Sequence, residues 1–292
     1  MIDVAIRTRT VAANGLSFTV DEAGEGDSVA LCLHGFPESR IAWRHQLPHL
    51  ASLGWRAAAP DMRGYGESSR PKGVKAYRVQ HLIDDAVALF DALGAKRRLL
   101  ISHDWGGVIA WALAAKRATP LDGLVVMNAP HPAVYRRAFT SSLKQPLKSW
   151  YIAFFQLPGL PEASLRRNNA AAVTKSFTAN VSDPSVFEAG VLETFRDNIL
   201  KPGAATAMIN YYRANGGVIW DRTLDRPIDV PTLLVWGEKD FALDLSLTEG
   251  NEPYVKDFTL ARIPGASHWV QQEAAAQVNA ALRNWMKLKG LA

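Results

Sequence analysis

The chain has 292 residues, 48% hydrophobic and 21% charged, a composition typical of a globular protein with a sizeable core. Its formal net charge is +5, but the lysines and arginines are scattered, which indicates a solvated basic surface and argues against a nucleic-acid partner. All apolar runs are far shorter than the roughly 20 residues that cross a bilayer, which argues against a membrane protein.

Cysteine usage and the first residues indicate a reducing compartment. The single cysteine, Cys32, lies in an apolar run and has no second cysteine for an internal disulfide. The first ten residues show neither a long apolar segment nor a small-residue cleavage site. We therefore expect a cytoplasmic protein, and the sequence leaves open whether it is a monomer or a homodimer.

Short apolar runs alternate with longer amphipathic segments, which predicts a mostly parallel sheet flanked by helices. We expect strands at residues 4–10, 16–21, 29–33, 56–59, 99–102, 124–127, 232–236 and 258–263. Apolar residues recur at helical spacing over residues 80–93, with Gly94 as a C-terminal cap, and again over residues 271–288.

The alternation stops between residues 131 and 226, where apparent helices are separated by prolines. We expect residues 1–130 and 227–292 to form an α/β core, and residues 131–226 to form a helical cap inserted between two strands. Open α/β sheets bind ligands beyond the carboxyl ends of their strands, so such a cap would cover the binding site.

The segment from Ser102 to Gly107 has the pattern of a nucleophile elbow. It joins an expected strand to an expected helix, and small residues stand two before and two after its centre. The central residue is Asp104, whose carboxylate is ionised at neutral pH without help from a base. Such an oxygen can displace a leaving group at saturated carbon, so the elbow points to epoxides or carbon–halogen bonds.

A second turn follows the third expected strand and consists of His34, Gly35, Phe36 and Pro37. This turn can aim the backbone N–H of Phe36 at the same space as the N–H of Trp105. Two converging amides of this kind form an oxyanion hole for a tetrahedral intermediate.

Two further polar side chains follow the last two expected strands. Asp240 comes after the seventh strand, and His268 comes after the eighth. Each one alone could be an ordinary solvated turn residue. With Asp104, however, they give the chain order nucleophile, acid and histidine, which is the order of α/β-hydrolases.

The sequence offers little support for a metal or an organic cofactor. His45 and His49 have i, i+4 spacing, but we expect Pro48 to interrupt that helix, and no carboxylate completes a zinc site. The loop at residues 63–66 lacks the lysine and helix start of a phosphate-binding loop. We expect neither kind of group.

Together these segments resemble the α/β-hydrolase-fold epoxide hydrolases. The similarity covers nearly the whole chain, through residues 34–37, 60–66, 103–107, 128–132, 237–240 and 265–269. The resemblance implies a catalytic triad of Asp104, Asp240 and His268. It also implies that His34, Gly35 and Pro37 shape the oxyanion loop, with a cis peptide before Pro37. Ser102 departs from the family pattern, in which glycine is commoner, but serine is small enough for the turn.

The family also grips the epoxide oxygen with two cap tyrosines, which the resemblance places at Tyr151 and Tyr212. Tyr211 and Tyr212 are adjacent on an expected helix, so their side chains point about 100° apart and only one can face a site. Spacing cannot choose between them. The resemblance selects Tyr212.

The implied reaction converts a small apolar epoxide and water to a vicinal diol through an ester on Asp104. A haloalkane dehalogenase is the nearest alternative, but those enzymes often have asparagine in the place of Phe36, and the two tyrosines favour an epoxide. Fluoroacetate dehalogenases also resemble this chain, but they carry an arginine that binds carboxylate in the position of Trp105, so Trp105 argues against this alternative. A non-catalytic receptor for a small apolar ligand is a third alternative, which the intact triad disfavours.

Overall fold

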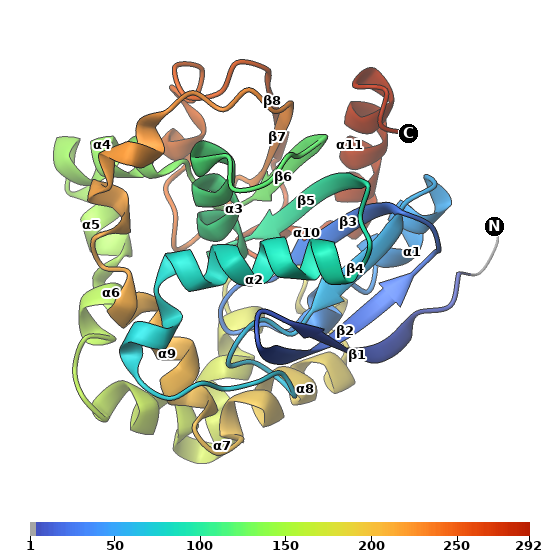
Figure 1. Ribbon diagram of the computed structural model, residues 1–292. Coiled ribbons are helices and arrows are strands. Elements are labelled where there is room, and N and C mark those ends of the chain that lie inside the picture. Colours follow the sequence, from blue (N-terminus) through green and yellow to red (C-terminus); the bar gives the residue numbers. More distant parts are fainter. Residues whose placement is uncertain (1–3) are drawn as a thin grey trace.

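The computed structural model describes residues 4–292, and within this range the strands form one eight-stranded sheet with the order β1-β2-β4-β3-β5-β6-β7-β8 (Figure 1). β2 pairs antiparallel with both β1 and β4, and the other neighbours are parallel. The bounds are β1 (Arg7–Ala13), β2 (Leu16–Ala23), β3 (Ser28–Leu33), β4 (Arg56–Pro60), β5 (Arg97–His103), β6 (Gly123–Met127), β7 (Thr232–Gly237) and β8 (Phe258–Ile263). The predicted mostly parallel sheet flanked by helices is confirmed.

Helices cover both faces of the sheet, which explains why the central strands read as continuous apolar runs. In β5, Leu100 packs in the cluster that includes α2 (Val79–Ala92) and α3 (Trp105–Lys116). Its neighbours Leu99 and Ile101 point to the opposite face. The helices on that face are α1 (Gln46–Ser52), α10 (Val270–Glu273) and α11 (Ala275–Leu288).

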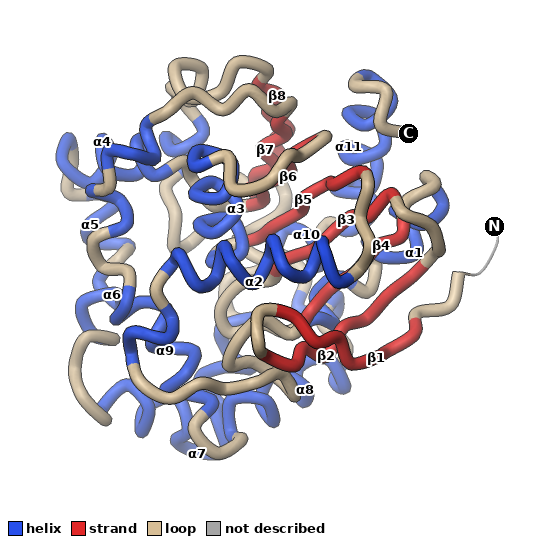
Figure 2. Tube along the Cα trace, in the orientation of Figure 1, coloured by secondary structure: helices blue, strands red, loops and turns tan. Residues whose placement is uncertain are grey.

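Between β6 and β7 the chain is helical. Figures 1 and 2 show these helices gathered at one side of the sheet, at the left and bottom of the view. They are α4 (Pro132–Ser141), α5 (Lys144–Lys148), α6 (Trp150–Phe154), α7 (Leu160–Thr178), α8 (Ala189–Leu200) and α9 (Ala204–Ala214). We call this segment, residues 132–225, the helical insertion; it ends with the short 3₁₀ helices η4 (Val218–Trp220) and η5 (Arg222–Asp225).

Three local expectations were wrong. The first strand runs from Arg7 to Ala13 instead of 4–10. The turn at Asn14 and Gly15, both with positive φ, sets the register of β1 against β2 and so fixes where the strand lies. The last helix is divided at Ala274, whose φ of −124° is not helical. Pro48 lies in the first turn of α1, where a missing N–H costs nothing.

A search of residues 4–292 finds no helix with the length and apolar character needed to cross a membrane.

Candidate active site

The elbow places Asp104 between β5 and α3 with φ 49° and ψ −116°, a conformation that non-glycine residues rarely adopt. Close packing of the flanking backbone holds it there. A Cβ on Gly106 would lie 2.1 Å from the carbonyl oxygen of Leu33, and one on Gly107 would lie 2.4 Å from the Cβ of Ala129. The small residues of the elbow are therefore required by contact distances.

This packing gives a stability prediction. Gly106→Ala should lower the free energy of unfolding by about 1–3 kcal/mol, because the backbone of β3 must move away from the new methyl group. Gly190→Ala is the matched control, since a Cβ on this exposed glycine of α8 has nothing within 4 Å. Denaturant unfolding measures both variants. Equal effects of the two substitutions would contradict the packing argument.

The amide of Phe36 lies against the elbow and donates a hydrogen bond of 2.7 Å to Asp104 Oδ1. This is one of the two expected oxyanion-hole amides. The amide of Trp105 begins α3, and within the described residues it makes no hydrogen bond to the Asp104 carboxylate. The structure thus brings Phe36 and Asp104 into contact, while Trp105 contributes an amide at a helix N-terminus next to them.

The rest of the oxyanion loop is tightly held. His34 is fully buried; its Nε2 accepts from the Met62 amide at 3.0 Å, which leaves Nδ1 to donate to the Gly35 carbonyl at 2.9 Å. A Cβ on Gly35 would lie 2.4 Å from the Cβ of Asp104. The peptide between residues 36 and 37 is cis, as the resemblance implied for Pro37.

The three members of the expected triad lie next to one another at the carboxyl ends of their strands: Asp240 after β7, His268 after β8 and Asp104 after β5. His268 Nδ1 is 2.8 Å from Asp240 Oδ2, and His268 Nε2 is 3.7 Å from Asp104 Oδ2. The two aspartates are therefore on opposite edges of one imidazole ring. Oδ2 of Asp104 faces the histidine, whereas Oδ1 is engaged by Phe36.

Asn128 is a functional candidate that the sequence reasoning passed over. It follows β6, and its side-chain amide donates to Asp240 Oδ2 at 2.7 Å while its Oδ1 accepts from the Gly237 amide. Asp240 Oδ1 accepts from the amides of Ala242 and Leu243. The carboxylate that holds His268 is therefore fully engaged. One feature of the sequence could have identified Asn128: it directly follows a strand, as Asp104 and Asp240 also come at strand ends.

A buried carboxylate and a second histidine also support the site. Glu38 Oε2 is 2.7 Å from His103 Nδ1, and His103 Nε2 is 2.8 Å from the carbonyl oxygen of His268. Glu38 Oε1 accepts from the side-chain amides of Gln271 and Gln272. These contacts tie the loop of His268 to the residue that precedes Asp104. Burial raises the pKa of Glu38, but His103 and His34 beside it bring that pKa below its usual range.

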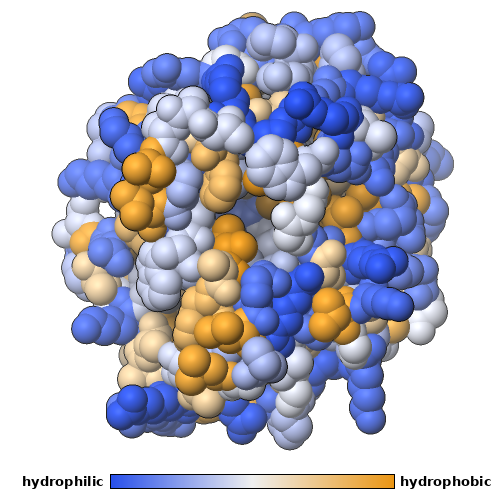
Figure 3. Space-filling model, turned by 90° about the vertical axis from the view of Figure 1, so that its left-hand side faces the viewer, coloured by the Kyte–Doolittle hydropathy of each residue, from blue (hydrophilic) through white to orange (hydrophobic). Residues whose placement is uncertain are grey.

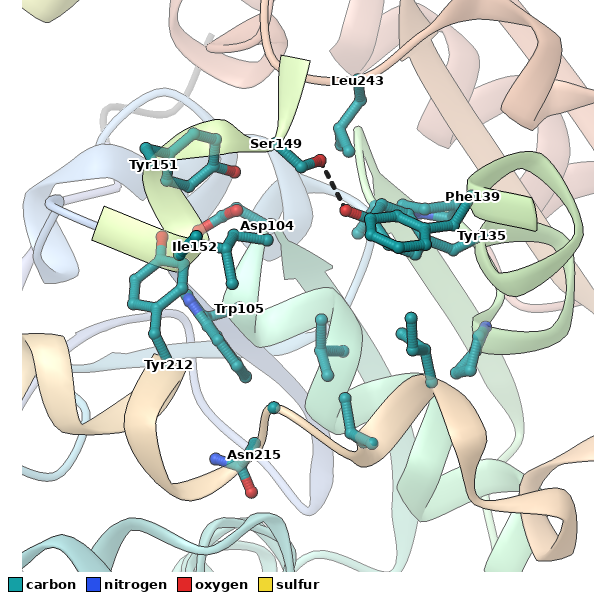
Figure 4. Close-up of a pocket in the computed structure, with 18 of the residues that line it drawn as sticks. Asp104, Trp105, Tyr135, Phe139, Ser149, Tyr151, Ile152, Tyr212, Asn215 and Leu243 are labelled. Atoms are coloured by element: carbon teal, nitrogen blue, oxygen red, sulfur yellow. Dashed lines mark hydrogen bonds between the residues drawn. The ribbon is translucent and has the colours of Figure 1, made fainter. Parts of the chain in front are cut away.

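The two tyrosines come from the helical insertion and face the elbow. Figure 4 shows the hydroxyls of Tyr151, on α6, and Tyr212, on α9, directed toward Asp104. The ring of Tyr212 packs against Trp105 with centroids 5.0 Å apart. Tyr211 points elsewhere, and its hydroxyl donates to the carbonyl oxygen of Arg63 at 2.8 Å. The structure therefore places Tyr212, not its neighbour, at the cavity.

Burial and neighbouring charges shift the pKa values of Asp104, Asp240 and His268. Burial raises the pKa of Asp104, but His268, His103 and the Phe36 amide together bring it below its ordinary value. Asp240 shows the same balance, with His268 as its main stabilising partner. Burial lowers the pKa of His268, but the two carboxylates overcome this and hold the pKa well above its ordinary value. These pKa directions favour an imidazolium between two carboxylates.

The pKa values of both tyrosines are held well above the ordinary range, first by burial and then by the charge of Asp104. A phenol in this state stays protonated at neutral pH. Tyr151 and Tyr212 are consequently hydrogen-bond donors aimed at the space above the carboxylate.

Asp104 opens onto a cavity of about 420 Å³, which lies within the range of small-molecule sites. Apolar side chains dominate its lining, among them Val108, Phe139, Ile219 and Leu243. On the face that carries α4, α5 and α6, Figure 3 shows apolar side chains around a hollow. The cavity therefore fits an apolar molecule that brings one polar group to Asp104.

Within residues 4–292, no three histidine, cysteine or acidic side chains are grouped so that they could hold a metal ion.

Comparison with known proteins agrees with this geometry. Residues 30–275 match the model of the alpha/beta hydrolase fold family. The AB hydrolase superfamily protein YfhM of Bacillus subtilis is 36% identical over 97% of this chain and 98% of its own length. Epoxide hydrolase A of Mycobacterium tuberculosis is 33% identical over 95% of this chain and 96% of its own. The crystal structure of a Bacillus megaterium epoxide hydrolase with an inhibitor has a TM-score of 0.87 at 26% identity, covering 96% of this chain and all of that one.

Proposed function

The chain belongs to the α/β-hydrolase-fold epoxide hydrolase family, and on this premise we propose that it converts a small apolar epoxide and water to a vicinal diol. One observation carries the proposal: the Asp104 carboxylate and the hydroxyls of Tyr151 and Tyr212 face one apolar cavity. Epoxide opening requires a nucleophile and a proton donor, and these three groups supply both. In this proposal residues 131–226 form the cap that supplies the tyrosines, over a core of residues 1–130 and 227–292.

The first step forms an ester. Asp104 Oδ1 is held by the Phe36 amide, so Oδ2 attacks a ring carbon from the side opposite the C–O bond that breaks. Tyr151 and Tyr212 hydrogen-bond the ring oxygen, and one of them donates its proton to the emerging alkoxide. The step leaves an alkyl ester on Asp104 with no remaining charge on that side chain.

The second step hydrolyses the ester. Loss of the Asp104 charge removes one of the two carboxylates that raise the pKa of His268, so ester formation itself shifts the histidine toward its neutral form. His268, oriented by Asp240, then takes a proton from water, and the water attacks the Asp104 carbonyl carbon. The new oxyanion forms at Oδ1, where the Phe36 amide already donates. The tyrosine that gave its proton to the alkoxide takes one back from His268, which leaves the histidine neutral before the water attacks. The tetrahedral intermediate then collapses: the bond between the Asp104 carbonyl carbon and Oδ2 breaks, and Oδ2 leaves in the diol with the second proton of the water. The Asp104 carboxylate and the imidazolium are thereby restored.

The pKa directions give a pH prediction. The pKa of Asp104 lies below its ordinary value of about 3.9, so the alkylation rate should not fall between about pH 8 and pH 5. Hydrolysis needs neutral His268, which is lost as the pH falls, so the ester should accumulate at about pH 5 and not at about pH 8. Rapid quenching and mass spectrometry of the ester measure both steps. A parallel loss of both rates toward acid would contradict the assignment of Asp104 and His268 to separate steps.

A turnover panel tests the proposed function. Purified protein is given styrene oxide and 1,2-epoxyhexane in one arm, and 1-chlorohexane and 1-bromohexane in the other. Diol formation from the epoxides, without comparable halide release, supports the proposal. If the protein mainly releases halide from the haloalkanes, it is a dehalogenase. If no compound is turned over and no covalent adduct forms on Asp104, the result favours a non-catalytic receptor.

A further inference from the structure

One surface of the helical insertion exposes large apolar side chains. Leu143 is 76% exposed, Leu147 71% and Trp150 66%, and Phe139 near the end of α4 is exposed as well. The amide of Leu147 donates to the carbonyl oxygen of Leu143 at 3.0 Å, so the two leucines are one turn apart on the same side of α5. We call these four side chains the apolar rim. Large apolar side chains that are exposed together mark an interaction surface.

The apolar rim borders the cavity onto which Asp104 opens. Phe139 and Trp150 line that cavity, and Figure 3 shows apolar side chains gathered around the hollow on this face. Whatever covers the apolar rim therefore also lies at the mouth of the cavity.

The same part of the chain holds its basic excess. Residues 136–175 contain seven lysines and arginines and one acidic residue, Glu162, so their net charge is +6, compared with +5 for the whole chain. Residues 123–161 contain no aspartate or glutamate. The cations are spaced apart in the sequence, but all seven lie on α4, α5 and α7. The first half of α7 lies beside the apolar rim, since Leu165 lines one pocket with Leu147 and Trp150.

Most of these cations have no carboxylate partner. Arg136 is buried and pairs with an aspartate of η5, but the other six form no ion pair within residues 4–292. Asp244 also lies near α5, where its hydrogen bonds with Ser246 and then the charges of Lys148 and Lys144 lower its pKa. The ammonium of Lys148 donates to two backbone carbonyl oxygens. The five exposed cations are Arg137, Lys144, Arg166, Arg167 and Lys175.

We propose that the apolar rim and these five cations dock the protein on an anionic lipid surface, with the mouth of the cavity against the lipid. Leucine and tryptophan side chains enter the boundary between head groups and acyl chains, and the cations stay at the lipid phosphates. A symmetric contact with a second copy is disfavoured, because a twofold interface brings the same cations of both copies together. Lipid binding needs no turnover, so this proposal does not depend on the proposed function.

The docking has a direct consequence for an apolar substrate. Such a molecule dissolves in the lipid and reaches the cavity beside Phe139 and Trp150 without first entering water. The contact is peripheral, since no helix within residues 4–292 has the length and apolar character to cross a membrane.

Vesicle flotation measures the docking. Wild-type protein is mixed with vesicles of phosphatidylcholine alone, or with vesicles of equal parts phosphatidylcholine and phosphatidylglycerol. Each lysine or arginine close to an anionic lipid surface strengthens binding roughly fivefold, so several of them should favour the anionic vesicles by roughly tenfold or more. High salt should release the protein, because screening removes this attraction.

A double variant tests whether the apolar rim makes the contact. Leu143 and Lys144 are both exposed, and neither lines a pocket that contains Asp104. Leu143→Gln combined with Lys144→Gln should weaken binding to anionic vesicles by roughly tenfold or more. The matched control is Lys287→Gln combined with Leu288→Gln, which removes the same two exposed side chains from α11, at the opposite side of the molecule in Figure 1. It should bind nearly as wild-type protein does.

A fluorescent label shows which face touches the lipid. Cys32 is fully buried and burial raises the pKa of its thiol, so a maleimide dye that senses polarity reacts at an introduced cysteine. The emission of a dye at Leu143→Cys should shift to shorter wavelength on anionic vesicles, whereas that of a dye at Lys287→Cys should stay unchanged.

Four outcomes would overturn the proposal. Wild-type protein that floats with neither kind of vesicle, or equally with both, does not recognise anionic lipid. Equal losses in the two double variants would show that binding reflects net charge and not the apolar rim. A dye that shifts only at Lys287→Cys would place the contact on the other face. If wild-type protein is a dimer in analytical ultracentrifugation and Leu143→Gln with Lys144→Gln makes it monomeric, the apolar rim is a contact between copies.

Discussion

His268→Gln should trap the enzyme as an ester on Asp104. Glutamine cannot take a proton from water, whereas Asp104 stays ionised and needs no base to attack the epoxide. Steady-state hydrolysis should fall by roughly 10²- to 10⁴-fold, the usual range for loss of a general base. Mass spectrometry should find the peptide that contains Asp104 heavier by one substrate mass.

The control for this variant is His81→Gln, which changes an exposed histidine on α2. It should retain wild-type turnover and accumulate no ester. If His268→Gln hydrolyses epoxides at the wild-type rate, another residue is the base and the proposed role of His268 is wrong.

The double replacement of Tyr151 and Tyr212 by Phe should nearly abolish ester formation. An alkoxide is a poor leaving group at neutral pH, so ring opening needs a proton donor, and both hydroxyls are held protonated above Asp104. Single replacements should lower the alkylation rate by roughly 10- to 10⁴-fold, the range expected for loss of an acid catalyst. Some alkylation should remain, because the other tyrosine can still donate a proton. Pre-steady-state measurement of ester formation reads this step directly.

Tyr211→Phe provides the matched control for the tyrosines. It removes a buried hydroxyl that donates to Arg63, so it should cost about 1 kcal/mol of stability and leave alkylation intact. If the folded double variant of Tyr151 and Tyr212 forms the ester at the wild-type rate, the two tyrosines only pack in the cavity and the proposed acid chemistry is wrong.

The sequence was most informative where physical constraints are local. Continuous apolar runs predicted the buried parallel strands, because both faces of these strands are covered. The elbow was recognisable because contact distances exclude side chains at Gly106 and Gly107. Asp104, Asp240 and His268 each follow a strand, and parallel strands deliver their carboxyl ends to one edge. Their proximity in the structure follows from that arrangement.

The supporting contacts could not be predicted because they join segments that are distant in the sequence. Glu38 reaches His103 and Gln271 across 65 and 233 positions, and no local pattern records such a contact. Asn128 stood at a strand end, but an asparagine there is also common in ordinary turns. The orientation of Tyr212 depends on packing against Phe155 and Trp105, which periodicity does not describe.

A single turnover in oxygen-18 water tests the central claim, that Asp104 supplies the oxygen that opens the epoxide. With enzyme in excess over substrate, the account predicts mostly unlabelled diol, because the new hydroxyl comes from Oδ2 of Asp104. The label should instead appear in the carboxylate of the peptide that contains Asp104, since water attacks the carbonyl carbon. Full labelling of the first diol, with no label in that peptide, would contradict the account and assign the opening to activated water.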